Sequence, residues 1–309
     1  MQSSLSSGCY RAAKRGQFSR RRLSISGGKR PPGTITLRMT RTIRMTLAYH
    51  GGGFHGWQRQ PGYRTVQEEV EQTVIRIIRH PTSVMGASRT DAGVHALGQV
   101  ASFRTDGPIP LRGLQNAIAH HLPDDIALVQ IQEAGASFHP SRDARGKLYR
   151  YRIFSAVERP VSRQRSGVAW HVWYALDTAR MQAAAAKMIG RHDFAGFQSA
   201  GNPRASTVRT VRRVHVRRRF DEVLIDVEGD GFLYNQVRNM VGTLYEIGRG
   251  HWPVERVDEI LVTSDRRLAG PTAPPEGLCL QWVKYDALAP SESAASASEP
   301  DRPPEGIAP

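Results

Sequence analysis

IRMTLAYH (Ile43–His50) and TVQEEVEQTVIRIIR (Thr65–Arg79) are the two segments that decide the fold class. The first alternates apolar and polar residues, which is typical of a strand with one buried face. The second places Val66, Val70, Val74, Ile77 and Ile78 on one face of a helix, and Thr65 with Glu68 fits a capping box at its start. A strand followed by an amphipathic helix therefore opens the folded part of the chain.

The same kind of pattern continues to the end of the first half of the chain. It predicts strands at Ser83–Ala87 and Gln99–Phe103, a helix at Leu111–His121 and a strand at Ile126–Gln132. The resulting order of elements is β-α-β-β-α-β.

The second half repeats this order without visible sequence identity to the first. We expect strands at Lys147–Phe154, Val208–Val216, Val223–Val227 and Leu278–Tyr285, a helix capped by Asp177 that runs through Ile189, and a helix at Leu233–Ile247. The fold class is therefore predicted as α+β. It consists of two ferredoxin-like halves, residues 43–145 and 146–286, each an antiparallel sheet with helices on one face.

The charge of the chain is concentrated at its beginning. The formal net charge is +15, which suggests a polyanionic partner, but eleven of the 43 Lys and Arg residues lie in residues 1–44, which contain no acid. We expect residues 1–42 to be a disordered basic extension and residues 287–309 a disordered tail. The extension fits a basic RNA-binding arm, an organelle transit peptide, or sequence upstream of a start at Met39 or Met45.

Membrane and disulfide classes have no support in the sequence. No run approaches the roughly 18 apolar residues that span a membrane. Cys9 and Cys279 lie far apart in the sequence and do not have the spacing of metal ligands, so we expect neither a disulfide framework nor a zinc site. We expect the protein to work in a reducing compartment.

A glycine run follows the first predicted strand. Gly51–Gly56 matches the pattern G-x-G-x-x-G, which brings a nucleotide-dependent oxidoreductase into consideration. The pattern requires a helix that opens directly on the glycines, whereas Trp57–Gly62 intervenes here. We therefore expect no nucleotide cofactor, and either a close approach of backbone at these glycines or a plain turn.

The segment Ala87–His95 (ASRTDAGVH) has the densest chemistry in the chain. A carboxylate beside an arginine is held ionised, which suits Asp91 next to Arg89 as a nucleophile. Composition alone favours an ordinary turn with a capping aspartate. No second carboxylate stands nearby, so the two-carboxylate pattern of glycosidases has no local support.

Arginines and tyrosines supply the remaining candidates. Arg204–Arg219 carries seven arginines in strand-like alternation, which fits either contact with RNA phosphates or a solvated edge strand, and we favour RNA contact. Tyr149 and Tyr151 share one face of a strand, where one ring could stack on a base or both could be core residues. Arg238 lies in a mostly apolar helix and needs a carboxylate partner, for which Asp91 is the candidate.

Taken together, these motifs resemble the TruA family of tRNA pseudouridine synthases. The resemblance runs in order from about Ile43 to Tyr285. It rests on Gly56-Trp57-Gln58-Arg59-Gln60, Arg89-Thr90-Asp91-Ala92-Gly93-Val94-His95, Tyr149-Arg150-Tyr151, Val237-Arg238-Asn239-Met240-Val241-Gly242 and Glu276-Gly277-Leu278. One position departs from the family pattern, because His50 stands where the family usually carries an aspartate.

The resemblance implies a pseudouridine-synthase-type core and a specific reaction. The enzyme would isomerise uridine to pseudouridine at tRNA positions 38, 39 and 40 in the anticodon stem-loop. Asp91 would be the nucleophile, Arg89 would fill the space of the flipped-out base and steer Asp91, and Arg238 would keep Asp91 ionised. Tyr149 would stack on that base and could also take part in proton transfer. It further implies a homodimer, no metal or other cofactor, and a cytoplasmic location. The alternative is a non-catalytic RNA-binding protein or tRNA chaperone on the same scaffold.

Overall fold

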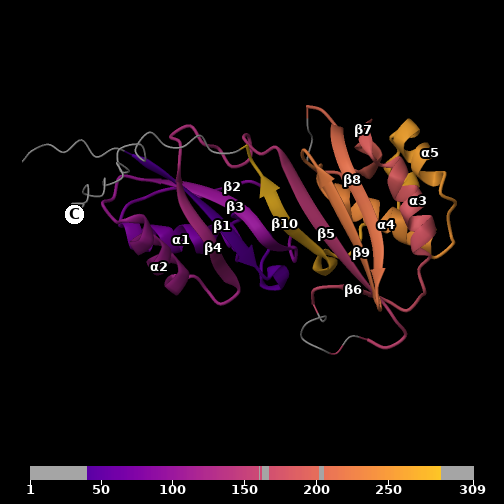
Figure 1. The fold of residues 1–309 in the computed structure, drawn as a ribbon, viewed down its shortest axis with the longest axis horizontal. Helices are drawn as coiled ribbons and strands as arrows, with labels where there is room; N and C mark the ends of the chain where they lie inside the picture. Colours follow the sequence, from indigo (N-terminus) through magenta and orange to yellow (C-terminus); the bar gives the residue numbers. More distant parts are fainter. Residues whose placement is uncertain (1–39, 160, 162–166, 202–204, 287–309) are drawn as a thin grey trace, which may run out of the picture. The chain divides into compact units, whose positions relative to one another are not determined.

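The structure, a computed structural model, describes residues 40–159, 161, 167–201 and 205–286 (Figure 1). Nearly all of the expected basic extension, the whole expected tail and Arg204 lie outside these residues. The first strand already begins at Arg41, so the last two residues assigned to the extension belong to the sheet. Met45 lies inside this strand and is fully buried.

The described helices and strands follow the predicted order, with additions. The strands are β1 (Arg41–Tyr49), β2 (Met85–Gly86), β3 (His95–Thr105), β4 (Ile126–Ala134), β5 (Gly146–Ser155), β6 (Trp170–Val172), β7 (Gly190–Asp193), β8 (Val208–Arg219), β9 (Glu222–Gly229) and β10 (Leu278–Lys284). The helices are α1 (Val66–Ile78), α2 (Leu111–His121), α3 (Thr178–Lys187), α4 (Gln236–Gly248) and α5 (Arg256–Thr263), with short 3-10 turns η1 (Gly51–Gly53), η2 (Ala195–Phe197), η3 (Arg266–Leu268) and η4 (Pro275–Gly277). The sequence patterns did not predict β6, β7 or α5.

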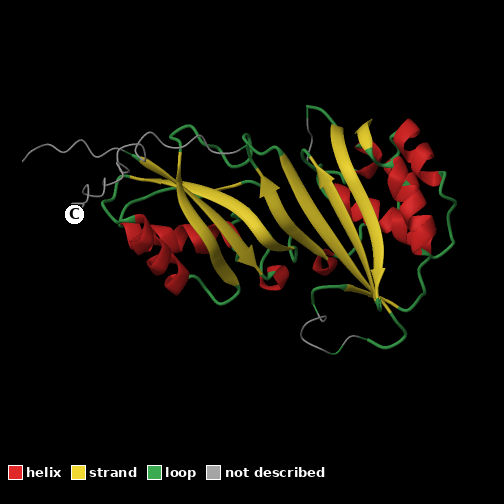
Figure 2. Ribbon diagram, in the orientation of Figure 1, coloured by secondary structure: helices red, strands yellow, loops and turns green. Residues whose placement is uncertain are grey.

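The strands form one large, mostly antiparallel sheet (Figures 1 and 2). Their order is β4-β1-β3-β10-β5-β9-β8-β7, with β2 added on β3 and β6 on β5. Among the strands of the described residues, only the pairs β10–β3 and β5–β6 are parallel. The last strand, β10, pairs with β3 of the first half and with β5 of the second, so it joins the sheets of the two halves.

The core follows the periodicities of the sequence. Ile43 and Leu47 of β1 are fully buried, as are Val66, Val70 and Val74 on the apolar face of α1. Each such side chain stabilises the fold by about 1.5–3 kcal/mol relative to its exposed state. Helices α1 and α2 contact each other beside β4, and α3 contacts both β8 and α4 (Figure 2).

The start of the first helix corrects one prediction. Thr65 is the N-cap of α1, but its side chain makes no capping hydrogen bond, so the predicted capping box is wrong. Thr65 is fully buried, and within the described part of the chain its hydroxyl has no hydrogen-bond partner.

The strand expected at Ser83–Ala87 is also much shorter than predicted. Side chains of α1 take the place of a neighbouring strand here, since Val84 N donates to Glu71 Oε2 at 2.9 Å and Gln67 Nε2 donates to Val84 O at 2.9 Å. Strand pairing is thereby confined to Met85–Gly86. Among the helices that the structure describes, none is both long and apolar enough to cross a membrane.

Candidate active site

The loop that carries Asp91 is seated on the glycine run after β1. A Cβ atom on Gly56 would lie 2.7 Å from Thr90 O, and one on Gly51 would collide with Val94 O. Gly56 also has a φ of +88°, a conformation that other residues rarely adopt. The close backbone approach predicted for these glycines is confirmed, and its target is the Asp91 loop.

Buried hydrogen bonds hold the residues on both sides of Arg89. The carboxamide of Gln99 accepts from Ser88 N at 3.2 Å and donates to Ser88 O at 2.6 Å. Tyr49 Oη and Thr90 Oγ1 are 2.8 Å apart, and Trp57 N donates to Thr90 O at 3.0 Å. All four of these contacts to the loop are made by residues of β1, β3 and the segment after the glycines.

Asp91 meets Arg238 across the joint between the two halves. Arg238 Nη1 lies 3.4 Å from Asp91 Oδ2, which is the ion pair expected for an arginine in an apolar helix. The guanidinium is held in place because Nε donates to Ala273 O at 2.7 Å and Nη1 donates to Asn235 Oδ1 at 3.1 Å. The Asp91 side chain is 22% exposed, so a substrate can reach it.

The pKa of Asp91 depends on burial as well as on its arginine partner. Burial raises the pKa of Asp91 above its usual 3.8, and the charge and hydrogen bond of Arg238 offset only part of this rise. Arg89, two positions before Asp91 in the sequence, does not contribute to this shift in pKa. Arg89 is exposed and makes no hydrogen bond or ion pair with any described residue, so the cation beside Asp91 is Arg238 rather than Arg89.

Tyr149 approaches the same loop from β5. Its hydroxyl lies 2.6 Å from Ser88 Oγ, and its ring meets the edge of Phe232 with centroids 5.5 Å apart. Burial raises the pKa of Tyr149, and the nearby charge of Asp91 adds to the rise. Tyr151 lies on the same face as predicted, but it is fully buried and donates to Pro274 O at 2.7 Å, which makes it a core residue.

His95 has a structural place in the site. Its Nδ1 accepts from Gly51 N at 3.0 Å, and its ring lies against that of His50, with centroids 4.6 Å apart. Burial, followed by the proximity of His50, lowers the pKa of His95 to about 4. His95 is therefore neutral near pH 7 and fastens the glycine run to the start of β3.

The sequence patterns missed Ser88, Gln99, Tyr49 and Asn235. Gln99 left one signal, since it is a glutamine in a predicted strand whose only other polar residue is Ser102, and such a side chain is buried only with partners. Asn235 has a φ of +58° immediately before α4, a conformation that asparagine tolerates better than most residues. Ser88 and Tyr49 gave no signal, because their partners depend on the register of three strands.

Several arginines of β8 lie on the face of the sheet opposite Tyr149. The register pairs Tyr149 with Val227 and Val227 with Val214, so Arg213, Arg217 and Arg219 point to the opposite face, whereas Arg218 shares the Tyr149 face. Carboxylates from β9 occupy some of them: Arg217 Nη1 lies 2.7 Å from Asp226 Oδ2, and Arg213 Nε lies 3.7 Å from Glu228 Oε2. The positive charge of this arginine-rich strand is therefore partly neutralised within the protein.

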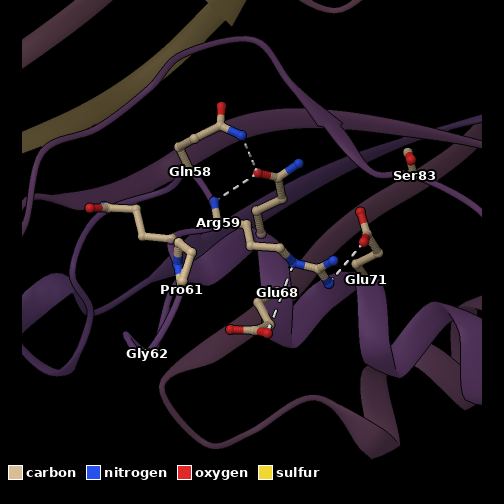
Figure 3. Close-up of a pocket in the computed structure, with 9 residues that line it drawn as sticks. Gln58, Arg59, Pro61, Gly62, Glu68, Glu71 and Ser83 are labelled. Carbon is tan, nitrogen blue, oxygen red and sulfur yellow. Dashed lines mark hydrogen bonds and ion pairs between the residues drawn. The ribbon is translucent and has the colours of Figure 1, made fainter.

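A polar pocket of about 430 Å³ lies beside the segment that supports the loop (Figure 3). Figure 3 shows the Arg59 side chain reaching across α1 to Glu68 and Glu71, with Arg59 Nη2 2.9 Å from Glu71 Oε1. None of the four predicted site residues lines this pocket; its lining consists of Gln58, Arg59, Gln60, Pro61, Gly62, Gln67, Glu68, Glu71 and Ser83. Its polar groups pair with one another and thereby fix the chain that follows Trp57. Over the described ranges, no three His, Cys, Asp or Glu side chains come together as a metal site.

Two solved structures show weak similarity to this chain. A Cbf5–Nop10–Gar1 complex and an archaeal box H/ACA sRNP Nop10–Cbf5 complex match with TM-scores of 0.32 and 0.34 at 10% and 12% identity. The matches cover 77% and 79% of this chain and 58% and 63% of those chains. Similarity at this level supports no comparison of sites.

Comparison with protein sequences gives a much closer similarity. The tRNA pseudouridine synthase A of Geotalea uraniireducens and that of Geobacter sulfurreducens are each 44% identical over 246 residues, which is 79% of this chain and all of each relative. The enzyme of the same name from Acetivibrio thermocellus is 41% identical over the same length. The family model described as tRNA pseudouridine synthase matches residues 45–141 and 184–286, which include the Asp91 loop and α4. The chain belongs to the tRNA pseudouridine synthase family.

Proposed function

We propose that this protein converts uridine to pseudouridine in the anticodon stem-loop of tRNA, at positions 38, 39 and 40, with Asp91 as the nucleophile. The proposal rests on the partly exposed Asp91 carboxylate, which forms an ion pair with Arg238 of the other half of the chain. The chain that carries this pair belongs to the tRNA pseudouridine synthase family. The reaction exchanges the C–N bond between uracil and ribose for a C–C bond, so it needs a nucleophile and a site that holds the detached base.

The side chains around Asp91 suit the steps of such a reaction. Asp91 would attack the uridine at C6 or at C1′, and Arg238 would stabilise its charge. Arg89 is exposed beside a fixed backbone, which suits a side chain that fills the space left by a flipped-out base. Tyr149 would stack on that base, and formation of the C5–C1′ bond would release the hydrogen from C5.

Tritium release tests this function directly. A tRNA labelled at uridine C5 should lose its label with the wild-type protein and keep it with Asp91→Asn, because the amide cannot act as a nucleophile. Asp124→Asn, an exposed aspartate outside the site, serves as the matched control and should release label at the wild-type rate. Tritium release by Asp91→Asn would exclude Asp91 as the nucleophile. No release by the wild type would instead favour a non-catalytic RNA-binding protein.

We also propose the finer architecture and the substrate surface. The orders β4-β1-β3-β2 and β10-β5-β9-β8 support a ferredoxin-like unit in each half. The exposed Arg213 and Arg219 of β8 support contact with the RNA backbone on the face opposite Tyr149, in a homodimer whose second copy presents that face. Arg219→Gln should then reduce the slope of log Kd against log salt by about one if Arg219 contacts a phosphate. A cytoplasmic location remains part of this proposal.

A further inference from the structure

We propose that Gln99 and Ser88 are positioning residues that set the Tyr149 ring and the backbone of Arg89 and Asp91 for the reaction. The inference rests on the proposed function, because it concerns the geometry of that same site. It assigns the Tyr149 hydroxyl to orienting the ring and not to proton transfer with the substrate.

Gln99 extends strand pairing by one residue with its side chain. Backbone pairing next to the loop ends where Ala87 N donates to Val100 O at 2.7 Å. At the following residue, Ser88, both backbone groups bind the Gln99 carboxamide, at 3.2 Å and 2.6 Å. Gln99 is fully buried, and its Nε2 also lies 3.4 Å from Tyr49 Oη, so both ends of the amide are used.

Thr90 is fixed on the other side of Arg89. Its hydroxyl contacts Tyr49 Oη and its carbonyl accepts from Trp57 N. Arg89 therefore lies between Ser88 and Thr90, which are both buried and hydrogen-bonded, while its own side chain is exposed. This arrangement holds the backbone rigid and leaves the guanidinium free to move into a substrate.

Ser88 connects the fixed loop backbone to the Tyr149 side chain through a hydrogen bond. Ser88 Oγ and Tyr149 Oη are 2.6 Å apart, and both residues are buried, 9% and 7% exposed. Detaching a buried hydroxyl from its protein partner is costly, because the buried group would then lack any hydrogen bond. The Tyr149 hydroxyl is thus committed to Ser88, which fixes the tilt of the ring against Phe232.

A double-mutant cycle separates this role from acid–base chemistry. The variants are Ser88→Ala, Tyr149→Phe, their combination, and Gln99→Met, which keeps the length of the side chain without its amide. Each single variant should slow single-turnover tritium release by about ten- to a hundred-fold with little change in tRNA Kd, since misplacement of reacting groups has effects of this size. The combination should be no slower than the slower single variant, because both remove the same hydrogen bond. Ser88→Thr should restore most of the rate.

Ser102→Ala is the matched control. Ser102 is a fully buried serine of β3 whose hydroxyl has no hydrogen-bond partner among the described residues, so its removal should leave the rate unchanged. Wild-type rates in Ser88→Ala and Gln99→Met would overturn the inference, as would multiplied effects in the combination. If Gln99→Met fails to fold, Ser88→Ala and the cycle still decide the question. No release by the wild type would overturn the proposed function together with this inference, whereas an active wild type limits any failure to the inference.

Discussion

At the scale of single residues, Asp91 is subject to two opposing influences. Burial favours its neutral form, and Arg238 favours its charged form. In the proposed mechanism only the ionised Asp91 carboxylate can attack a uridine, so the balance between these influences would determine the lowest pH at which the enzyme works. Arg238 comes from α4, and its orientation depends on Asn235 and on the carbonyl of Ala273.

Replacement of Arg238 should therefore change the pH dependence of the reaction. In Arg238→Met the pKa of Asp91 should rise further, because burial would remain and the opposite charge would be gone. The rate falls as pH drops through the pKa of a nucleophile, so the acid limb of kcat/KM should move to higher pH. Arg238→Lys, which keeps the charge but not the fork of hydrogen bonds, should show a smaller shift. An acid limb that is identical in Arg238→Met and the wild type would contradict this assignment.

At the scale of elements, β3 and its flanking loop connect the site to the sheet. The strand begins at His95, four residues before the predicted Gln99, because His95 and Ala96 pair with β10, which is remote in sequence. His95 also holds the glycine run through Gly51 N. The attachment of the glycine run to the start of β3 thus depends on the buried, neutral imidazole of His95.

This dependence predicts a loss of stability in mild acid. The folded-state pKa of His95 is lowered to about 4, whereas an unfolded histidine titrates near 6.5. Between these values the unfolded chain binds the extra proton, so the contribution of neutral His95 to stability is present above about pH 6.5 and is lost as pH falls towards 4. Melting temperatures across this range should fall less steeply for His95→Gln, whose side chain can still accept from Gly51 N. Equal slopes for both proteins would show that His95 is not responsible.

Helix α4 offers a second prediction at this scale. Gly242 faces the chain at Pro271, and a Cβ atom there would collide with Pro271 O. Gly242→Ala should destabilise the protein by about 1–3 kcal/mol, since backbone cannot yield as a flexible side chain can. Denaturant unfolding measures this change. Gly135→Ala is the control because a Cβ atom on Gly135 meets nothing within 4 Å, and equal stabilities of the two variants would contradict the prediction.

The elements also show what the sequence allowed us to predict. Local periodicity was sufficient for α2, whose bounds agree with the prediction, and for the Asp177 cap of α3, which accepts from Ala179 N and Arg180 N. The Asp91–Arg238 ion pair could also be predicted, because an arginine in a mostly apolar helix needs a carboxylate partner and Asp91 was the candidate. Local periodicity failed for the short strands β6 and β7, which exist through pairing with remote strands, and for the network around Ser88, which depends on the register of β1, β3 and β5.

At the scale of the whole described chain, β10 determines whether the site is assembled. Asp91 belongs to the first half and Arg238 to the second, and β10 is the strand that pairs with both halves. Its pairing with β5 is irregular between Leu280 and Trp282, and the residue between them, Gln281, lies against Gly98 of β3. A Cβ atom on Gly98 would collide with Gln281 O, so only glycine at this position allows β10 to pack closely against β3.

Gly98→Ala should consequently separate the two halves slightly without abolishing either core. Since Arg238 would then move away from Asp91, the variant should lose activity and should also shift the acid limb of kcat/KM to higher pH, as Arg238→Met does. A variant that merely unfolds would lose active protein while the remaining fraction kept the wild-type pH profile. The measurement is therefore the pH profile of tritium release at temperatures well below the melting point, with Gly135→Ala as the control. A Gly98→Ala protein with reduced activity and an unshifted acid limb would mean that β10 supports the fold but does not set the distance between Asp91 and Arg238.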